Sequence, residues 1–201
     1  MEKKIIIVGG GGHAKVLLDI LKMNNANILG FVDIKETDFP EEYLGKDEAL
    51  SDQYSPQDIA LVNGVGSVKR PEQRQKVFEY FKSLKYEFVP VVHPRATISE
   101  SAEVGEGVQI MANAVVNPGS VVEDNAIVNT SASIDHDCKI GAHSHIAPGV
   151  TLSGNVHVGV GCHLGTGTTV IQGITIGDRV LIGAGEVVRK DVTNGKRVLT
   201  R

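Results

Sequence analysis

The 201-residue sequence predicts an α/β, Rossmann-like domain over residues 1–92, followed by a left-handed parallel β-helix of hexapeptide repeats over residues 93–201. Two observations predict this fold class. Near the N-terminus an apolar run, four glycines and an amphipathic stretch follow one another, as in a strand–loop–helix unit. From Ile98 onward an aliphatic residue returns every six positions, which is the period of a β-helix.

The first domain alternates strands and helices. Residues 5–8 form an apolar run that predicts a buried strand, and residues 13–21 predict an amphipathic helix. Further strands are expected at 28–33 and 59–63, and a second helix at 71–84 with a proline at its start. The polar stretch 35–57 predicts a loop with at most a short turn of helix.

The glycines after the first strand predict an anion site, because backbone N–H groups and the positive end of a helix would face the ligand. Gly9, Gly11 and Ala14 fit the spacing G-x-G-x-x-G/A. Asp33 ends the second strand, the position of the acid that binds the ribose hydroxyl in such sites. A domain of about 90 residues lacks room for a second mononucleotide half, so a mononucleotide or nucleotide sugar fits better than a dinucleotide. A tight turn without a ligand is the alternative.

Sixteen consecutive sites spaced by six, from Ile98 to Val188, all hold Ile, Leu or Val. Three hexads make one triangular coil, so residues 18 apart stack on one face, and stacked coils bury a continuous core. The residue two before the aliphatic is often small and suits the crowded interior. We expect the glycine that follows six of the aliphatics to allow a turn with positive φ; these are Gly105, Gly141, Gly159, Gly165, Gly177 and Gly183.

His136 lies between Asp135 and Asp137. A carboxylate bonded to one ring nitrogen fixes the tautomer and raises the basicity of the other, which predicts a general base. A solvated turn is the alternative. His145 follows nine residues later, half a coil on, so the two histidines point from different faces. They can share a site only across a subunit boundary, which fits a homotrimer. His145 and His163 are 18 apart and should stack.

Several classes of protein are disfavoured. No two histidines have the five-residue spacing used by hexapeptide-repeat carbonic anhydrases, so no catalytic metal is expected. Cys138 and Cys162 are 24 apart and should not stack, which favours small buried thiols in a reducing compartment over a disulfide. A net charge of −4 without a basic block disfavours nucleic acid and anionic membranes. No apolar run reaches the roughly 20 residues of a membrane span, which favours the cytoplasm.

The whole chain resembles the bacterial sugar O/N-acetyltransferases of the sialic acid O-acetyltransferase type. In pattern it is most similar to the N-acetyltransferases that act on UDP-4-amino-4,6-dideoxy sugars. The order of four motifs carries the resemblance: residues 9–15 (GGGGHAK), 30–33 (GFVD), 93–96 (HPRA) and 129–131 (NTS). The chain departs from the family at Ile34, where a second acid is usual, and in residues 194–201, which lack a G-x-P-A segment.

The resemblance implies transfer of an acetyl group from acetyl-CoA to a sugar amine or hydroxyl, with the amine of a nucleotide-linked sugar as the first candidate and direct attack on the thioester. It implies His136 as the base, with Asp137 or Asp135 raising its basicity and Asn129 nearby. It further implies that acetyl-CoA contacts His145, Gly154, Thr166 and Ala184, and that the nucleotide sugar contacts Gly11, Gly12, His13, Asp33 and Gly64.

Other functions remain open at this point. GDP-perosamine or a sialic acid hydroxyl would keep the chemistry and change the acceptor. A non-catalytic nucleotide-binding module on a β-helix spacer would leave the acids around His136 without a role. A dehydrogenase would leave the β-helix unexplained. A transferase that acts on acyl carrier protein would need a basic patch, and Lys and Arg are sparse across residues 96–188.

Overall fold

The structure, a computed structural model, describes residues 3–67 and 71–199. The chain divides into two compact units, Met1–Val91 and Val92–Arg201. This division lies one residue before the boundary expected from the sequence. No helix in the described ranges is long and apolar enough to cross a bilayer.

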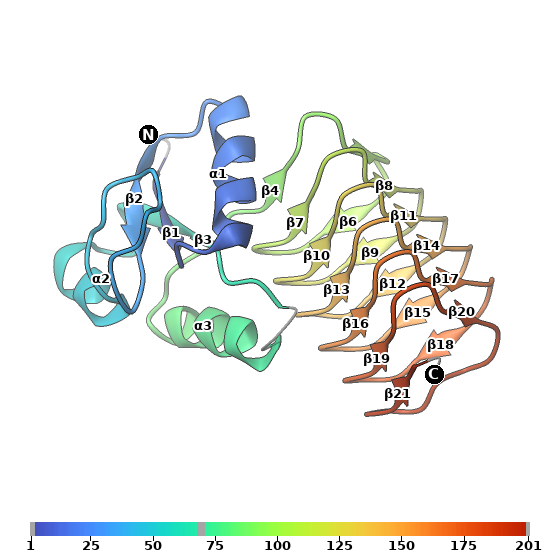
Figure 1. Ribbon diagram of the computed structural model, residues 1–201. Coiled ribbons are helices and arrows are strands. Elements are labelled where there is room, and N and C mark those ends of the chain that lie inside the picture. The colour runs from blue at the N-terminus through green and yellow to red at the C-terminus, as the bar shows by residue number, and fades with distance from the viewer. Residues whose placement is uncertain (1–2, 68–70, 200–201) are drawn as a thin grey trace. The chain divides into compact units, whose positions relative to one another are not determined.

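Within its described residues, the first unit contains a three-stranded parallel sheet with the order β2-β1-β3 and three helices (Figure 1). The central strand is apolar because both of its faces are covered, and α1 buries one face that includes Leu17 and Leu21. The elements are β1 (Lys4–Val8), α1 (Gly12–Met23), β2 (Ile28–Val32), α2 (Asp47–Gln53), β3 (Ile59–Asn63) and α3 (Pro71–Ser83).

Helix α2 corrects the expectation for residues 35–57. It has seven residues, about two turns, where the sequence predicted a short turn at most. Among its residues only Leu50 is buried, so the segment shows little apolar periodicity. Asp47 and Glu48 lie in its first turn, where negative charge suits the helix dipole.

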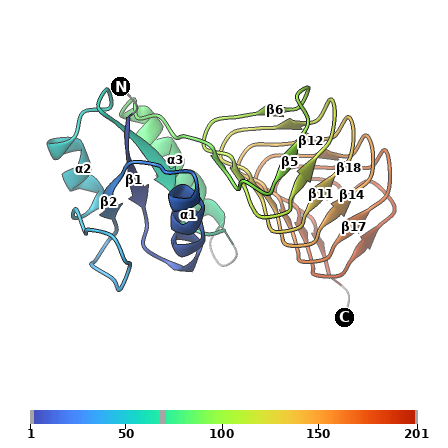
Figure 2. The same ribbon diagram turned by 90° about the horizontal axis from the view of Figure 1, so that it is seen from above.

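The second unit is the predicted left-handed β-helix, in which strands from successive coils stack into three parallel sheets (Figures 1 and 2). One sheet contains β4 (Val91–Val92), β7 (Gln109–Ile110), β10 (Ile127–Val128), β13 (His145–Ile146), β16 (His163–Leu164), β19 (Leu181–Ile182) and β21 (Arg197–Val198). The next contains β5 (Thr97–Ile98), β8 (Val115–Val116), β11 (Ser133–Ile134), β14 (Thr151–Leu152), β17 (Thr169–Val170) and β20 (Val187–Val188). The third contains β6 (Glu103–Val104), β9 (Val121–Val122), β12 (Lys139–Ile140), β15 (His157–Val158) and β18 (Thr175–Ile176).

The register confirms that residues 18 apart pair, as in Ile134 with Leu152 and His145 with His163. The hexad aliphatics form one core, and small residues such as Ala132 and Cys138 are buried beside them, as predicted. The period therefore fixes which side chains point inward and which are available at the corners.

The reason given for the glycines after the aliphatics was wrong. Positive φ occurs three residues after the aliphatic, as at Asn155 (φ 56°) and Gly161 (φ 66°), and not at the six glycines that follow it directly. At all of them but Gly183, consecutive coils approach so closely that a Cβ would lie 2.8 Å or less from the backbone of the next coil. A Cβ on Gly141, for example, would lie 2.5 Å from the carbonyl carbon of Gly159.

Candidate active site

His136 lies at the corner that follows β11, where its side chain is 61% exposed. Its Nδ1 is 2.8 Å from Oδ2 of Asp137. Asp137 has φ 59°, a left-handed conformation that Asp tolerates, and its N–H donates to the carbonyl of Pro118 in the preceding coil. The turn that the hexad requires thus holds the carboxylate beside the ring.

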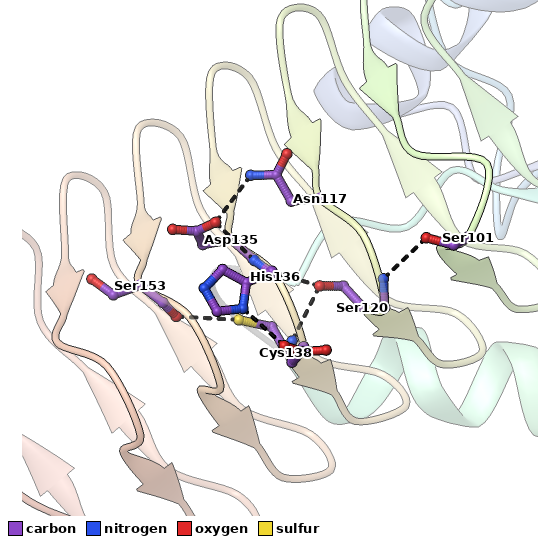
Figure 3. Close-up of polar contacts among 9 residues, drawn as sticks. Ser101, Asn117, Ser120, Asp135, His136, Cys138 and Ser153 are labelled. Atoms are coloured by element: carbon purple, nitrogen blue, oxygen red, sulfur yellow. Dashed lines mark hydrogen bonds and ion pairs between the residues drawn. The ribbon is translucent and has the colours of Figure 1, made fainter.

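Asp135 organises the other side of this corner (Figure 3). Its Oδ1 accepts a hydrogen bond from the His136 N–H at 2.8 Å and one from Nδ2 of Asn117 at 3.3 Å. Its carbonyl accepts from the Ser120 hydroxyl at 2.7 Å, and that hydroxyl accepts from the Cys138 N–H. Asn117 and Ser120 were not singled out from the sequence, although Asn117 lies 18 residues before Asp135, the spacing at which coils stack.

Two glycines on the neighbouring coils leave room for the His136–Asp137 pair. A Cβ on Gly119 would lie 2.6 Å from Oδ1 of Asp137, and a Cβ on Gly154 would lie 2.5 Å from Nε2 of His136. The structure therefore brings Gly154 directly against the ring nitrogen that is turned away from the carboxylate. The signal for both glycines was the 18-residue spacing to the residue they face.

The electrostatics of the corner favour a protonated ring. The hydrogen bond that His136 donates to the Asp137 carboxylate raises the pKa of His136 above its usual value, and the charge of Asp135 adds to the effect. The same bond makes Nδ1 the proton-bearing nitrogen of the neutral ring, which leaves Nε2 as the basic atom.

Asn129 and His145 form a second group on a different sheet. Nδ2 of Asn129 is 3.0 Å from Nε2 of His145, which lies in β13 and is buried. His163 pairs with His145 in the next coil, which confirms the predicted ladder, and the two rings meet edge to face with 4.9 Å between centroids. Burial lowers the pKa of His163, and its Nδ1 has no hydrogen-bond partner in residues 3–67 and 71–199.

Thr166 and Ala184 occupy the corner after β16 and β19, in the same hexad position as His136 but on another edge of the prism. A single chain thus does not bring them to His136. Cys138 and Cys162 are buried free thiols. Among the described residues, no three His, Cys, Asp or Glu side chains are placed to hold a metal ion.

The first unit gathers the residues expected to bind a nucleotide sugar. The N–H of Gly10 donates to Oδ2 of Asp33 at 2.7 Å, which fixes the acid beside the glycine loop. Helix α1 begins at Gly12 without a side-chain cap, and a Cβ on Gly11 or Gly12 would meet nothing within 4 Å. The first amides of this helix have no intrahelical acceptor, so this open end can receive an anion.

Gly64 and its neighbours form the other side of this loop. The Gly64 N–H donates to the Val8 carbonyl, and a Cβ on Gly64 would lie 2.6 Å from the Gly9 oxygen. A Cβ on Gly66 would lie 3.5 Å from Cβ of His13. A hollow of about 420 Å³ elsewhere in this unit, lined by Asp47 and one side of α3, contains none of the predicted site residues.

A hexapeptide-repeat β-helix with an acid-supported histidine at one corner, preceded by an α/β unit with a glycine loop, defines the class of hexapeptide-repeat transferases. Residues 4–81 match the PglD N-terminal domain family, residues 119–154 match the bacterial transferase hexapeptide, and residues 155–190 match the hexapeptide repeat of succinyl-transferase.

Among curated proteins, the UDP-N-acetylbacillosamine N-acetyltransferase of Bacillus subtilis is 33% identical over 116 residues. This match covers 55% of the chain and about half, 52%, of the relative. The acetyltransferase domain of PglB from Neisseria gonorrhoeae is 34% identical with a TM-score of 0.89, over 98% of this chain and 96% of that one. The same domain has also been solved in complex with acetyl coenzyme A.

PerB from Caulobacter crescentus, solved with CoA and GDP-perosamine, is 36% identical with a TM-score of 0.89, over 95% of this chain and 91% of that one. The chain therefore belongs to the family of sugar N-acetyltransferases that join a PglD N-terminal domain to a hexapeptide-repeat β-helix.

Proposed function

We propose that this protein transfers the acetyl group of acetyl-CoA to the amino group of a nucleotide-linked 4-amino-4,6-dideoxy sugar, with a UDP sugar as the first candidate. The name of the Bacillus relative supports the UDP sugar, and the complexes of the Neisseria and Caulobacter proteins support the thioester donor. The reaction belongs in the cytoplasm, where both substrates would be available.

The observation that carries the proposal is the contact between His136 and Asp137. Because Asp137 holds Nδ1, Nε2 is the nitrogen that takes a proton. In the proposed step the sugar nitrogen attacks the thioester carbonyl, so that an N–C bond forms and the C–S bond breaks. The amine proton passes to Nε2 of His136, and CoA leaves as a thiolate that is then protonated. A backbone N–H such as that of Gly154 would stabilise the oxyanion.

The proposed site lies between subunits of a homotrimer. His136 follows β11, whereas Asn129 follows β10 and His145 lies in β13, and both of these strands belong to another sheet. Two faces of one prism cannot enclose a ligand, but one face of each of two neighbouring prisms can. His145, Thr166 and Ala184 of a neighbouring copy would then contact acetyl-CoA while His136 and Gly154 face the thioester.

A second candidate acceptor is GDP-perosamine. The similarity to the Caulobacter protein favours it, because that match extends over 95% of this chain. Both acceptors use the same base and the same donor, so the choice concerns the nucleotide end of the site. A sialic acid hydroxyl is a third acceptor with the same mechanism.

The test is release of CoA thiol from acetyl-CoA with a panel of UDP- and GDP-linked 4-amino sugars, for the wild type and for His136→Ala. We expect turnover with one sugar, and a loss of roughly 10²–10⁴-fold in the variant. Turnover with a GDP sugar alone would show that the acceptor is GDP-linked and would leave the proposed mechanism unchanged. Unchanged turnover in His136→Ala would remove His136 from the mechanism, and no turnover with any amine or hydroxyl would favour a binding module.

A further inference from the structure

Arg74 is the largest fully buried side chain in the part of the chain that the structure describes, with 1% of its surface exposed. It lies in the first turns of α3, and one of its terminal nitrogens donates to two backbone carbonyls. These are the carbonyl of Asn63 and the carbonyl of Val65, each at 2.9 Å. One guanidinium nitrogen thus binds the backbone carbonyls of the two residues that flank Gly64.

The side chain of Asn63 forms two further hydrogen bonds in the same region. Its Nδ2 donates to the backbone carbonyl of Arg74 at 3.1 Å, and its Oδ1 accepts from the Val65 N–H at 3.2 Å. Three of these hydrogen bonds join the end of β3 and the loop after it to the start of α3, and the fourth, between Asn63 and Val65, lies within the loop. Together they fix the path of residues 63–65.

This loop packs against the glycine loop that follows β1. Cγ2 of Val65 would lie 3.2 Å from a Cβ on Gly9, and the Gly64 N–H is bonded to Val8. Because a trans peptide turns its N–H away from its carbonyl, the Gly66 N–H points away from Arg74. The position of Arg74 therefore sets where the second wall of the glycine loop lies and how its amides are oriented.

Burying a guanidinium in this part of the core carries a large desolvation penalty. Burial lowers the pKa of Arg74 to about 9, which reflects the cost of removing the guanidinium from water. An apolar side chain of similar volume would fill the core without that cost, so packing alone does not explain the guanidinium. Its donors do explain it, since an apolar group cannot hold two carbonyls.

We propose that Arg74 is a positioning residue, which holds the loop of residues 63–66 as one wall of the nucleotide-sugar site opposite Gly9–His13. The inference rests on the proposed function, because it assigns the diphosphate of the nucleotide sugar to this end of the unit. Arg74 acts through the loop and does not touch the substrate.

The test compares Arg74→Met and Arg74→Lys with the wild type and with Lys76→Met, which removes an exposed cation from the same helix. We expect Arg74→Met to raise KM for the nucleotide sugar by ~10-fold or more, while kcat and KM for acetyl-CoA stay within ~2-fold. Arg74→Lys should recover part of the loss, because its single nitrogen can still meet a carbonyl. Lys76→Met should match the wild type. Calorimetry with UDP and GDP should show the same order of affinities.

A wild-type KM for the sugar in a folded Arg74→Met protein would overturn the inference and leave the proposed function standing. Equal changes in both KM values and in kcat, together with a lower melting temperature, would indicate a merely structural role and would also overturn it. If Arg74→Met fails to fold, Asn63→Ala removes the loop bonds by another route and must show the same selective rise in KM. A wild-type protein that turns over no nucleotide sugar and binds neither UDP nor GDP would overturn both proposals.

Discussion

Replacing Gly154 by alanine should move the proposed base and leave the fold intact. The new Cβ would lie 2.5 Å from Nε2 and 2.6 Å from Cε1 of His136, whereas non-bonded carbons keep about 3.5 Å apart. The ring must therefore retreat by about 1 Å. It can do so freely, because it is 61% exposed, and Ala112, Ala142 and Ala184 already occupy the equivalent hexad position. A displacement of that size costs on the order of 10²-fold in turnover.

The assay is release of CoA thiol under saturating acetyl-CoA, with thermal unfolding measured in parallel. Gln172→Ala is the matched control, since Gln172 lies 18 residues beyond Gly154 on the same corner and is exposed. We expect kcat to fall in Gly154→Ala alone, with unchanged melting temperatures for both variants. A Gly154→Ala protein with the kcat and pH profile of the wild type would refute the claim that Nε2 of His136 works at this position.

Three further predictions concern single side chains. Because Asp137 raises the pKa of His136, Asp137→Asn should shift the acid limb of the pH–rate profile to lower pH and lower the plateau rate; an unshifted limb would separate Asp137 from the base. Burial lowers the pKa of His163 in the folded state, so the unfolded chain binds the extra proton and stability should fall as pH drops below the unfolded value of about 6.5. His163→Phe should flatten that fall in melting temperature between pH 7.5 and pH 5, and an equal slope in both proteins would contradict it. Asn155 has φ 56°, so Asn155→Val should destabilise the coil by about 1–2 kcal/mol while Asn155→Gly stays near neutral, as read from denaturant unfolding; similar losses in both variants would argue against backbone strain.

The β-helix was readable from the sequence because its period is local and is repeated without interruption. Each hexad places one aliphatic side chain in the interior independently of the rest of the chain, so the buried positions could be predicted from the spacing alone. Helix α2 could not be predicted in the same way, because Leu50 is its only buried residue and one apolar position gives no helical periodicity. The role of the glycines after the aliphatics was also hidden, since it depends on the distance between coils.

Only part of the geometry around His136 could be predicted from the sequence. The acids beside His136 are neighbours in the chain, so the sequence could predict that one of them contacts the ring. Gly119, Asn117 and Gly154 reach the corner only through the stacking of coils, and their distances to Asp137, Asp135 and His136 exist only in the folded unit.

By itself, the sequence determined the fold class, the interior of the β-helix and the candidate base, because each depends on spacing along the chain. Only the tertiary structure decided that Asp137 is the acid on Nδ1, that Gly154 lies against Nε2, and that Arg74 grips the loop after β3. The first contact joins chain neighbours whose backbone conformation selects one acid, and the other two join residues separated by a coil or a crossover. Their geometry depends on backbone conformation and packing, which a linear pattern of residue types does not encode.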